Sequence, residues 1–152
     1  LFTDMAMTVP VGALSAVSEG TRVLMDTTQK ALEVGISAAR GGNTVGDIGY
    51  AIEKFVRAKN TKYGIVEVLS GHGVGKAIHE DPYIPNFGKK GTGAKLVPGM
   101  VVALEPMLNS GTKNVTIDDD GYTFRTADGK KSAHFEHTIL ITEGEAEILT
   151  QM

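Results

Sequence analysis

The chain has 152 residues, no cysteine and a formal net charge of −3 at pH 7. This length suits one hydrophobic core, so we expect a single domain over residues 1–152. The lack of cysteine excludes disulfides and thiolate metal sites, and is compatible with a reducing, cytoplasmic location. The weakly acidic balance gives no reason to expect a nucleic-acid partner, and no apolar stretch approaches the length that a membrane span needs.

The first segment is predicted to be a strand over residues 3–11. The chain starts at Leu1 rather than at methionine and enters this strand almost at once. Natural chains seldom begin inside a strand, because an unpaired edge exposes backbone donors and acceptors. The sequence therefore predicts a domain that is incomplete at its N-terminus.

Two helices are expected next. Ser15 is a plausible N-cap for a helix that runs to about Arg40, where Gly41-Gly42 ends it. Thr44, with Asp47 three residues later, resembles a capping box for a second helix that runs to about Lys59. Two apolar stripes at helical spacing predict the buried faces. The stripes are Val17, Leu24, Ala31 and Leu32, then Ile48, Ala51, Ile52, Phe55 and Val56.

Short apolar runs that alternate with turn-forming residues predict several strands after the helices. Asp120-Gly121 and Asp128-Gly129 are hairpin turn signals. The segment 82–98, rich in glycine, proline and lysine, is predicted to be a long loop. The order of elements predicts an α+β fold with both helices on one face of a mainly antiparallel sheet. The runs are residues 65–69, 100–104, 114–117, 122–126 and 134–142.

His72 is flanked by glycines in Gly71-His72-Gly73, which would allow a metal or a substrate to approach the imidazole closely. A histidine in a flexible turn is the alternative. The run is not a dinucleotide-binding motif, because Lys76 stands where the last glycine of G-x-G-x-x-G belongs.

Two glutamates occupy apolar surroundings. Glu105 ends the run 100–104 and by strand alternation shares a face with Val101 and Ala103. A buried carboxylate needs a cation, a hydrogen-bond network or a raised pKa, although a salt bridge at the strand end would also satisfy it. Glu136 is predicted to lie in mid-strand, on the same face as His134 and Thr138. One imidazole with separated carboxylates suits a divalent ion such as Mn²⁺, Fe²⁺, Co²⁺ or Zn²⁺.

Several segments, in their order and spacing, are similar to those of bacterial-type (type I) methionine aminopeptidases. They are Asp4-Met-Ala-Met-Thr-Val-Pro-Val-Gly12, Asp47-Ile-Gly-Tyr-Ala-Ile52, Gly71-His-Gly-Val-Gly-Lys-Ala-Ile-His-Glu-Asp-Pro82, Glu105-Pro-Met-Leu-Asn109 and Ser132-Ala-His-Phe-Glu-His-Thr138. The resemblance implies the pita-bread fold of the creatinase and aminopeptidase enzymes, of which this chain would be mainly the C-terminal half. It also implies a metal-dependent enzyme that removes the initiator methionine from peptides and nascent proteins.

The resemblance further implies specific roles for residues of this chain. Asp4, His72, Glu105 and Glu136 would bind two divalent ions, with cobalt, manganese, iron and zinc as candidates. His79 would contact the scissile peptide, and Ile78 and Tyr122 would line the pocket for the methionine side chain. Glu105 could move a proton from the attacking water towards the departing amine.

A fifth ligand of the family, an aspartate on the preceding strand, has no counterpart in residues 1–152, so one metal site is expected to be weakened. The chain is accordingly expected to associate with the segment that precedes it in the family, or with itself. Two rival functions remain open: an Xaa-Pro peptidase or creatinase relative on the same fold, and a non-catalytic binding module or inactive fragment.

Overall fold

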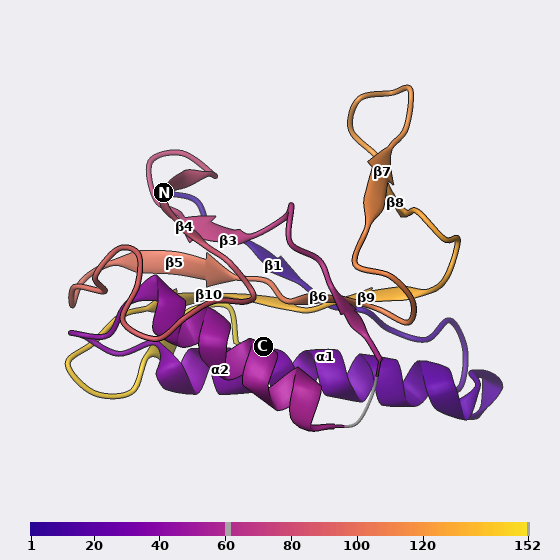
Figure 1. The fold of residues 1–152 in the computed structure, drawn as a ribbon. Coiled ribbons are helices and arrows are strands. Elements are labelled where there is room, and N and C mark those ends of the chain that lie inside the picture. Colours follow the sequence, from indigo (N-terminus) through magenta and orange to yellow (C-terminus); the bar gives the residue numbers. More distant parts are fainter. Residues whose placement is uncertain (60–61, 152) are drawn as a thin grey trace.

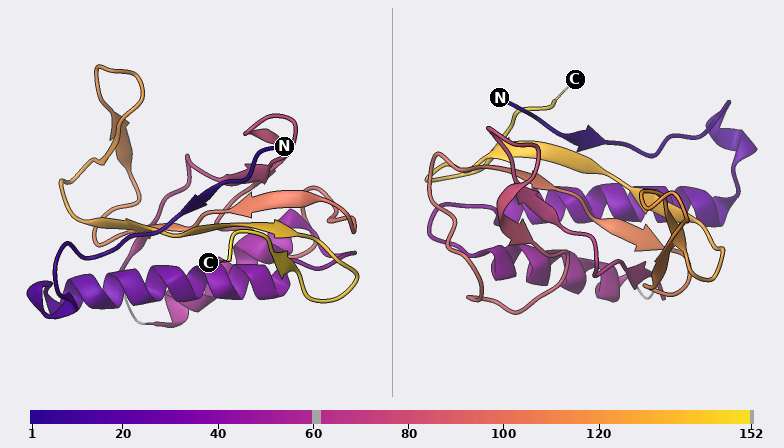
Figure 2. Two further views of the ribbon diagram at one scale, coloured as in Figure 1. Left: turned by 180° about the vertical axis from the view of Figure 1, so that it is seen from behind. Right: turned by 90° about the horizontal axis from the view of Figure 1, so that it is seen from above.

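The fold is α+β, with two helices against one face of an antiparallel sheet, as the sequence predicts (Figure 1). The computed structural model describes residues 1–59 and 62–151. Figure 2 shows both helices on the same side of the sheet in views from behind and from above. The core fills the space between these layers, where Leu24, Ile52, Leu104 and Ile139 are each at most 1% exposed.

Helix α1 spans Glu19–Ala38 and begins three residues later than predicted. Ser18, not Ser15, is its N-cap, because the Ser18 hydroxyl accepts a hydrogen bond from the backbone N–H of Thr21. Ser15 lies instead in a short 3₁₀ turn, Leu14–Ala16. Val17 therefore falls outside the helix, and the predicted buried stripe begins at Leu24.

Helix α2 spans Val45–Ala58, close to its predicted bounds. The capping box is present: the Asp47 carboxylate accepts from the backbone N–H of Thr44, 2.9 Å away. Hydrogen bonding to Thr44 lowers the pKa of Asp47, as expected for a carboxylate that accepts donors. Ile48, Ile52 and Val56 of the predicted stripe are fully buried.

The main sheet has the strand order β1-β10-β5-β3-β4, with β11 also paired to β10. Within the described residues, all strand pairings of this sheet are antiparallel. These strands are β1 (Met5–Ala6), β3 (Gly71–Gly73), β4 (Glu80–Ile84), β5 (Val101–Leu104), β10 (Glu136–Leu140) and β11 (Glu147–Ile148).

Two smaller sheets complete the fold. One has the order β2-β6-β9, and the other is the hairpin of β7 and β8, which stands away from the sheet on the side opposite the helices (Figure 1). Asp120-Gly121 forms the turn of this hairpin, as predicted, with Gly121 at a φ of 70°. The strands are β2 (Gly64–Ile65), β6 (Met107–Asn109), β7 (Val115–Ile117), β8 (Phe124–Thr126) and β9 (Ser132–His134).

The predicted strand 3–11 is mostly wrong, since only Met5–Ala6 is a strand. After Ala6, hydrogen bonds from the Thr8 side chain replace the backbone pairing. The Thr8 hydroxyl donates to the carbonyl of His134 and accepts from the N–H of His134, both at 2.9 Å. Pro10 then offers no backbone donor, and Gly12 turns the chain with a φ of 87°. Side-chain bonding and proline thus end the strand early.

Other boundaries also differ from the predictions. The segment 82–98 is not all loop, because its first residues, Pro82 to Ile84, belong to β4. Asp128-Gly129 is a turn, but β8 and β9 on either side of it pair with β7 and β6, so it closes no hairpin. Phe135 separates β9 from β10, which makes Glu136 the first residue of a strand rather than a mid-strand residue. No helix among residues 1–59 and 62–151 is both long and apolar enough to cross a membrane.

Gly49→Ala should destabilise the fold by about 1–3 kcal/mol, because an inflexible backbone occupies the space that the new methyl needs. A Cβ there would lie 2.7 Å from the Pro85 carbonyl oxygen and closer still to that of Phe87. Urea denaturation of the variant and the parent chain measures the effect. Gly20→Ala in α1 is the control, since nothing lies within 4 Å of a Cβ there. Equal stability of the two variants would contradict the proposed close packing.

Candidate metal centre

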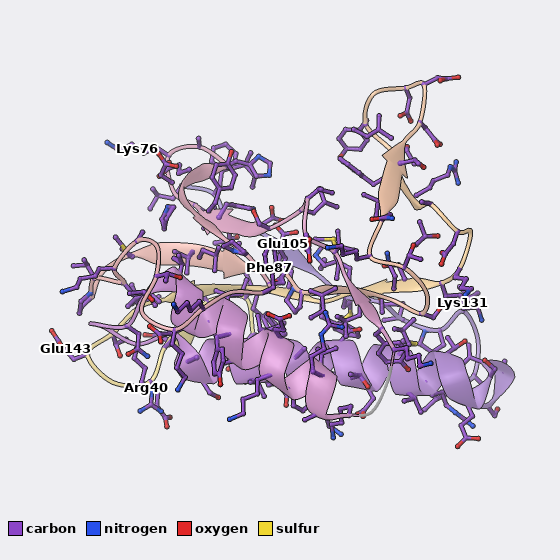
Figure 3. All side chains as sticks on the ribbon, in the orientation of Figure 1. Arg40, Lys76, Phe87, Glu105, Lys131 and Glu143 are labelled. Atoms are coloured by element: carbon purple, nitrogen blue, oxygen red, sulfur yellow. The ribbon has the colours of Figure 1, made fainter. Side chains whose placement is uncertain are left out.

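The strand register gathers the candidate residues on one face of the main sheet. Met5 pairs with His137, Thr138 with Ala103, and Ala103 with His72. Residues directly opposite one another in an antiparallel ladder point to the same side, and so do residues two apart in one strand. Asp4, Thr138 and His72 therefore share a face, with Glu136 and Glu105 in the adjacent row. Figure 3 shows Glu105 on the side of the sheet away from the helices.

His72 is the buried imidazole of the centre, with its side chain 4% exposed. Its Nδ1 lies 2.9 Å from the carbonyl oxygen of Gly73, which favours a proton on Nδ1 and leaves the Nε2 lone pair free. Nε2 lies 3.6 Å from Oε1 of Glu105 and 3.9 Å from Oδ2 of Asp4. The imidazole thus presents a ligand nitrogen to two carboxylates.

The glycines around His72 let the neighbouring strands approach, rather than a substrate. A Cβ at Gly71 would collide with the carbonyl oxygen of Ala103 in β5. A Cβ at Gly73 would collide with the carbonyl of Asp81 in β4. The register of β3 against β4 also shifts between these glycines. Glycine on both sides therefore fixes the depth of His72 in the sheet.

Asp4 is held through its backbone by Thr138, which is fully buried. The Thr138 hydroxyl accepts from the N–H of Asp4 at 2.8 Å and donates to its carbonyl at 2.7 Å. The Asp4 carboxylate, about one-third exposed, stays available to face His72. Thr138 thus fixes the backbone of Asp4 and leaves the carboxylate oxygens of Asp4 unbound.

Glu136 is buried, the side chain of Glu105 is 14% exposed, and both carboxyl groups have raised pKa values. Burial, then the charges of Glu136 and Asp4, raises the pKa of Glu105 to about 8. Burial, then the charge of Asp4, raises the pKa of Glu136 to about 7. The Oε1 atom of Glu136 is buried with no hydrogen-bond partner. Such an atom needs a proton or a cation, because an unpaired buried charge is costly.

The separation of these groups sets the size of the repulsion. One ligand atom each from His72, Glu105 and Glu136 lie within 4.8 Å of one another. Two unit charges at that distance repel by roughly 3 kcal/mol at an effective dielectric constant of 20. This corresponds to about two pKa units, and burial adds to it, so the metal-free centre holds carboxyl protons at pH values where free glutamates have lost theirs.

The donor set fits a divalent ion. Ligands about 2.1 Å from one ion lie roughly 3.0–3.4 Å apart, so the separations around His72 need to shrink by a few tenths of an ångström. Carboxylates with one neutral imidazole suit Mn²⁺, Fe²⁺, Co²⁺ or Zn²⁺. The orphaned oxygen of Glu136 and the mutual repulsion of the acids would both be relieved by the cation.

His79 and Ile78 lie at the border of this centre, just before β4. The His79 ring packs edge-on against His72, with ring centroids 4.4 Å apart and an interplanar angle of 64°. His79 forms a second possible ligand group with Asp4 and His72, but it is exposed to solvent. Ile78 is half-buried. His79 thus lies exposed at the border of the centre, and its contact with a substrate stays a prediction.

Tyr122 is not brought together with the other candidates. It lies in the turn between β7 and β8, and 86% of its surface is exposed. The hairpin projects from the sheet face that carries Glu105 (Figure 3). Contact between Tyr122 and a molecule at the centre stays a prediction.

Three residues near the centre were not assigned roles from the sequence. Thr138 anchors Asp4, and Asn86 donates from Nδ2 to the carbonyl of Glu105 at 3.2 Å. His134 places Nε2 3.5 Å from Oε2 of Glu105 and 3.8 Å from Oε2 of Glu136. Alternation along residues 134–138 does place His134 and Thr138 on the face of Glu136, which is a usable signal. No local pattern marks Asn86.

The chain belongs to metallopeptidase family M24, whose model matches residues 1–143. Within this family, the chain is similar to methionine aminopeptidase 1 of Bacillus subtilis, at 43% identity over 149 residues. It is also 43% identical over 151 residues to methionine aminopeptidase 1 of Mycobacterium tuberculosis. These alignments cover 98% and 97% of the chain but 58% and 56% of the relatives. The chain thus spans a little over half the length of these curated relatives.

Solved structures agree with this assignment. Methionine aminopeptidase from Thermotoga maritima superposes with a TM-score of 0.91 at 42% identity, over 99% of this chain and 58% of that one. X-Pro aminopeptidase from the same organism gives a TM-score of 0.71 at 22% identity, which is a likeness of fold alone. The fold is the pita-bread fold of these metallopeptidases.

The metal-free chain should lose stability as the pH rises from about 5 to 8. The folded-state pKa values of Glu105 and Glu136, about 8 and about 7, lie above their ordinary value of 4.5. The folded state therefore holds protons that the unfolded state releases, and the free energy of unfolding falls through this window. Urea denaturation in EDTA at several pH values measures the slope.

Two comparisons test the cause of this slope. Glu105→Gln should flatten the pH dependence, because the neutral amide cannot titrate. Saturating Mn²⁺ should also remove the decline in the parent chain, since the ion replaces the protons. An unchanged slope in Glu105→Gln would show that other groups control it.

Proposed function

We propose that this chain is the catalytic part of a metal-dependent aminopeptidase that removes N-terminal methionine from peptides and nascent proteins. The observation that carries the proposal is the buried group His72, Glu105 and Glu136, with Asp4 beside it, in a member of family M24. Similarity at 43% identity to proteins named methionine aminopeptidase 1 supports the substrate class.

Asp4, His72, Glu105 and Glu136 would hold the metal, with one ion or two and with cobalt, manganese, iron or zinc as candidates. A bound divalent ion makes a neighbouring water more acidic and polarises a carbonyl group. If two ions bind, Asp4 and Glu136 would take part in holding both. The Nε2 lone pair of His72 faces the same space as the carboxylates, in agreement with this assignment.

Glu105 and His79 would have separate roles in the reaction. Glu105 accepts a proton from the attacking water and delivers it to the departing amine, a role suited to a carboxyl group whose pKa the site raises. His79 donates a hydrogen bond to the carbonyl oxygen or nitrogen of the scissile peptide as charge develops. Its exposed ring beside His72 supports this role.

Substrate selection is proposed to involve Ile78 and Tyr122, which would contact the methionine side chain. Ile78 precedes His79 in sequence and is half-buried, which supports its part in such a wall. Because nascent proteins acquire their N-termini in the cytoplasm, we place the activity there.

The chain with Mn²⁺ or Co²⁺ should release methionine from a Met-Ala-Ser peptide, and Glu105→Gln should abolish the release. Loss of the proton-transfer carboxylate is expected to cost at least 10²-fold in rate. Chromatography of the released amino acid measures it. An Ala-Pro peptide tests the Xaa-Pro rival, and metal binding without any product would favour the non-catalytic binding module or an inactive fragment.

A second proposal concerns association. An apolar strip runs from β1 towards α1 at the edge of the main sheet, and its members are 36–96% exposed: Met5, Met7, Val9, Val11 and Leu14. Exposed apolar area of this kind marks interfaces. We expect the chain to self-associate, or to bind the segment that precedes this region in its relatives.

Light scattering tests the association. The parent chain should exceed the mass of a 16.1 kDa monomer, and Met7→Lys with Val9→Lys should shift it towards the monomer. Addition of a peptide carrying the preceding segment of a relative should compete with self-association. A well-folded monomer that ignores the peptide would contradict the proposal.

A further inference from the structure

His134 is an imidazole of the centre that none of the ligand assignments uses. It is the last residue of β9, and the Thr8 hydroxyl holds its backbone N–H and carbonyl, each at 2.9 Å. The Nε2 atom of His134 is buried and has no hydrogen-bond partner, although the side chain as a whole is 35% exposed. A rigid backbone thus directs an unsatisfied nitrogen into a group of acids.

Glu105 lies between two imidazoles. Its Oε1 atom is 3.6 Å from Nε2 of His72, and its Oε2 atom is 3.5 Å from Nε2 of His134. The two histidines therefore face different oxygens of one carboxylate. His72, with its proton favoured on Nδ1, is placed as a ligand, so Oε1 is the oxygen on the metal side. Oε2 is left for His134.

The surroundings decide which atom of His134 carries the proton. Nε2 faces Oε2 of Glu105 and Oε2 of Glu136, at 3.5 and 3.8 Å. Once a cation has displaced the carboxyl protons, a lone pair directed at two carboxylate oxygens would be repelled, whereas an N–H would be attracted. The separation of 3.5 Å exceeds the usual N–H···O length by roughly 0.5 Å, which a small rotation of Glu105 can close.

We propose that His134 is a positioning residue that donates a hydrogen bond from Nε2 to Oε2 of Glu105 and keeps Oε1 turned towards His72. The proposal rests on the proposed metal centre and adds a residue to it. The bond makes Glu105 a one-oxygen ligand with fixed orientation. Partners of this kind orient metal ligands, and their loss commonly costs 10–100-fold in metal affinity.

The bond also bears on proton transfer by Glu105. A carboxylate free to rotate could bind an ion through both oxygens, and neither would then be directed at a water. With Oε2 held by His134, the carboxylate has one defined geometry at the reacting position. Asn86 also restrains Glu105, because its Nδ2 donates to the backbone carbonyl of Glu105 at 3.2 Å.

The test compares His134→Gln with His134→Leu in the full chain. Glutamine offers an N–H donor of similar reach, whereas leucine has similar bulk and no donor. Titration calorimetry with Co²⁺ measures affinity, and the visible absorption of bound Co²⁺ reports the ligand geometry. We expect His134→Leu to bind Co²⁺ 10–100-fold more weakly with an altered spectrum, and His134→Gln to restore both.

His137→Leu is the matched control, because His137 neighbours Glu136 but points to the other face and contacts Thr150. It should keep the affinity of the parent chain. Thermal unfolding in EDTA identifies variants that no longer fold, and His134→Ala, which avoids the branched side chain, replaces His134→Leu if the latter fails.

Each remaining outcome overturns a stated part of the argument. Unchanged affinity and spectrum in His134→Leu would remove His134 from the centre. Equal losses in His134→Gln and His134→Leu would show that the imidazole is itself a ligand and not a positioning donor. A parent chain that binds no Co²⁺ would overturn the proposed metal centre together with this inference. Normal binding without methionine release would leave the positioning role standing and overturn the activity alone.

Discussion

The antiparallel register of β1, β10, β5 and β3 is the constraint on which the centre depends. It aligns Thr138, Ala103 and His72 across three strands and brings Asp4 beside Thr138. The acids one row away come from the ends of two of the same strands. A slip of one residue in any strand would turn its contribution to the helix-facing side. The packed core against α1 and α2, with Leu104 and Ile139 fully buried, opposes that slip.

The hydrogen bonds around the centre hold the backbone and leave the carboxylates free. Thr138 binds the main chain of Asp4, and Asn86 binds the carbonyl of Glu105. Within the described part of the chain, no hydrogen bond is recorded to the carboxylate oxygens of Asp4, Glu105 or Glu136. The backbones of Asp4 and Glu105 are thus held in place, and without a cation the acids keep protons that free carboxyl groups would have lost. Crowded acids of this kind cost stability without a cation, and a bound cation would relieve that cost.

The sequence predicts local features of the fold and of the centre well, and it predicts contacts between distant residues poorly. The capping box of α2, the turn at Gly121 and the shared face of His134, Glu136 and Thr138 follow from neighbouring residues. The contact between Asp4 and Thr138 joins residues 134 positions apart, and no local pattern encodes it. The early end of β1 depends on the Thr8 hydroxyl meeting His134, which is equally remote. The ligand set follows from the family resemblance and not from any local pattern.

The position of Glu105 in the fold determines the chemical properties of its carboxyl group. Glu105 directly follows Leu104, the last residue of β5, and lies beyond the paired part of the strand. Pro106, the next residue, has no backbone N–H that could continue the pairing. Burial and the charges of Glu136 and Asp4 raise the pKa of its carboxyl group, which lies beside two imidazoles that approach different oxygens. The two oxygens have different neighbours, so the one carboxylate can bind a cation through Oε1 while His134 orients it through Oε2. The position of Glu105 at the end of β5 largely buries its carboxylate, and the strand register places a different imidazole beside each of its two oxygens.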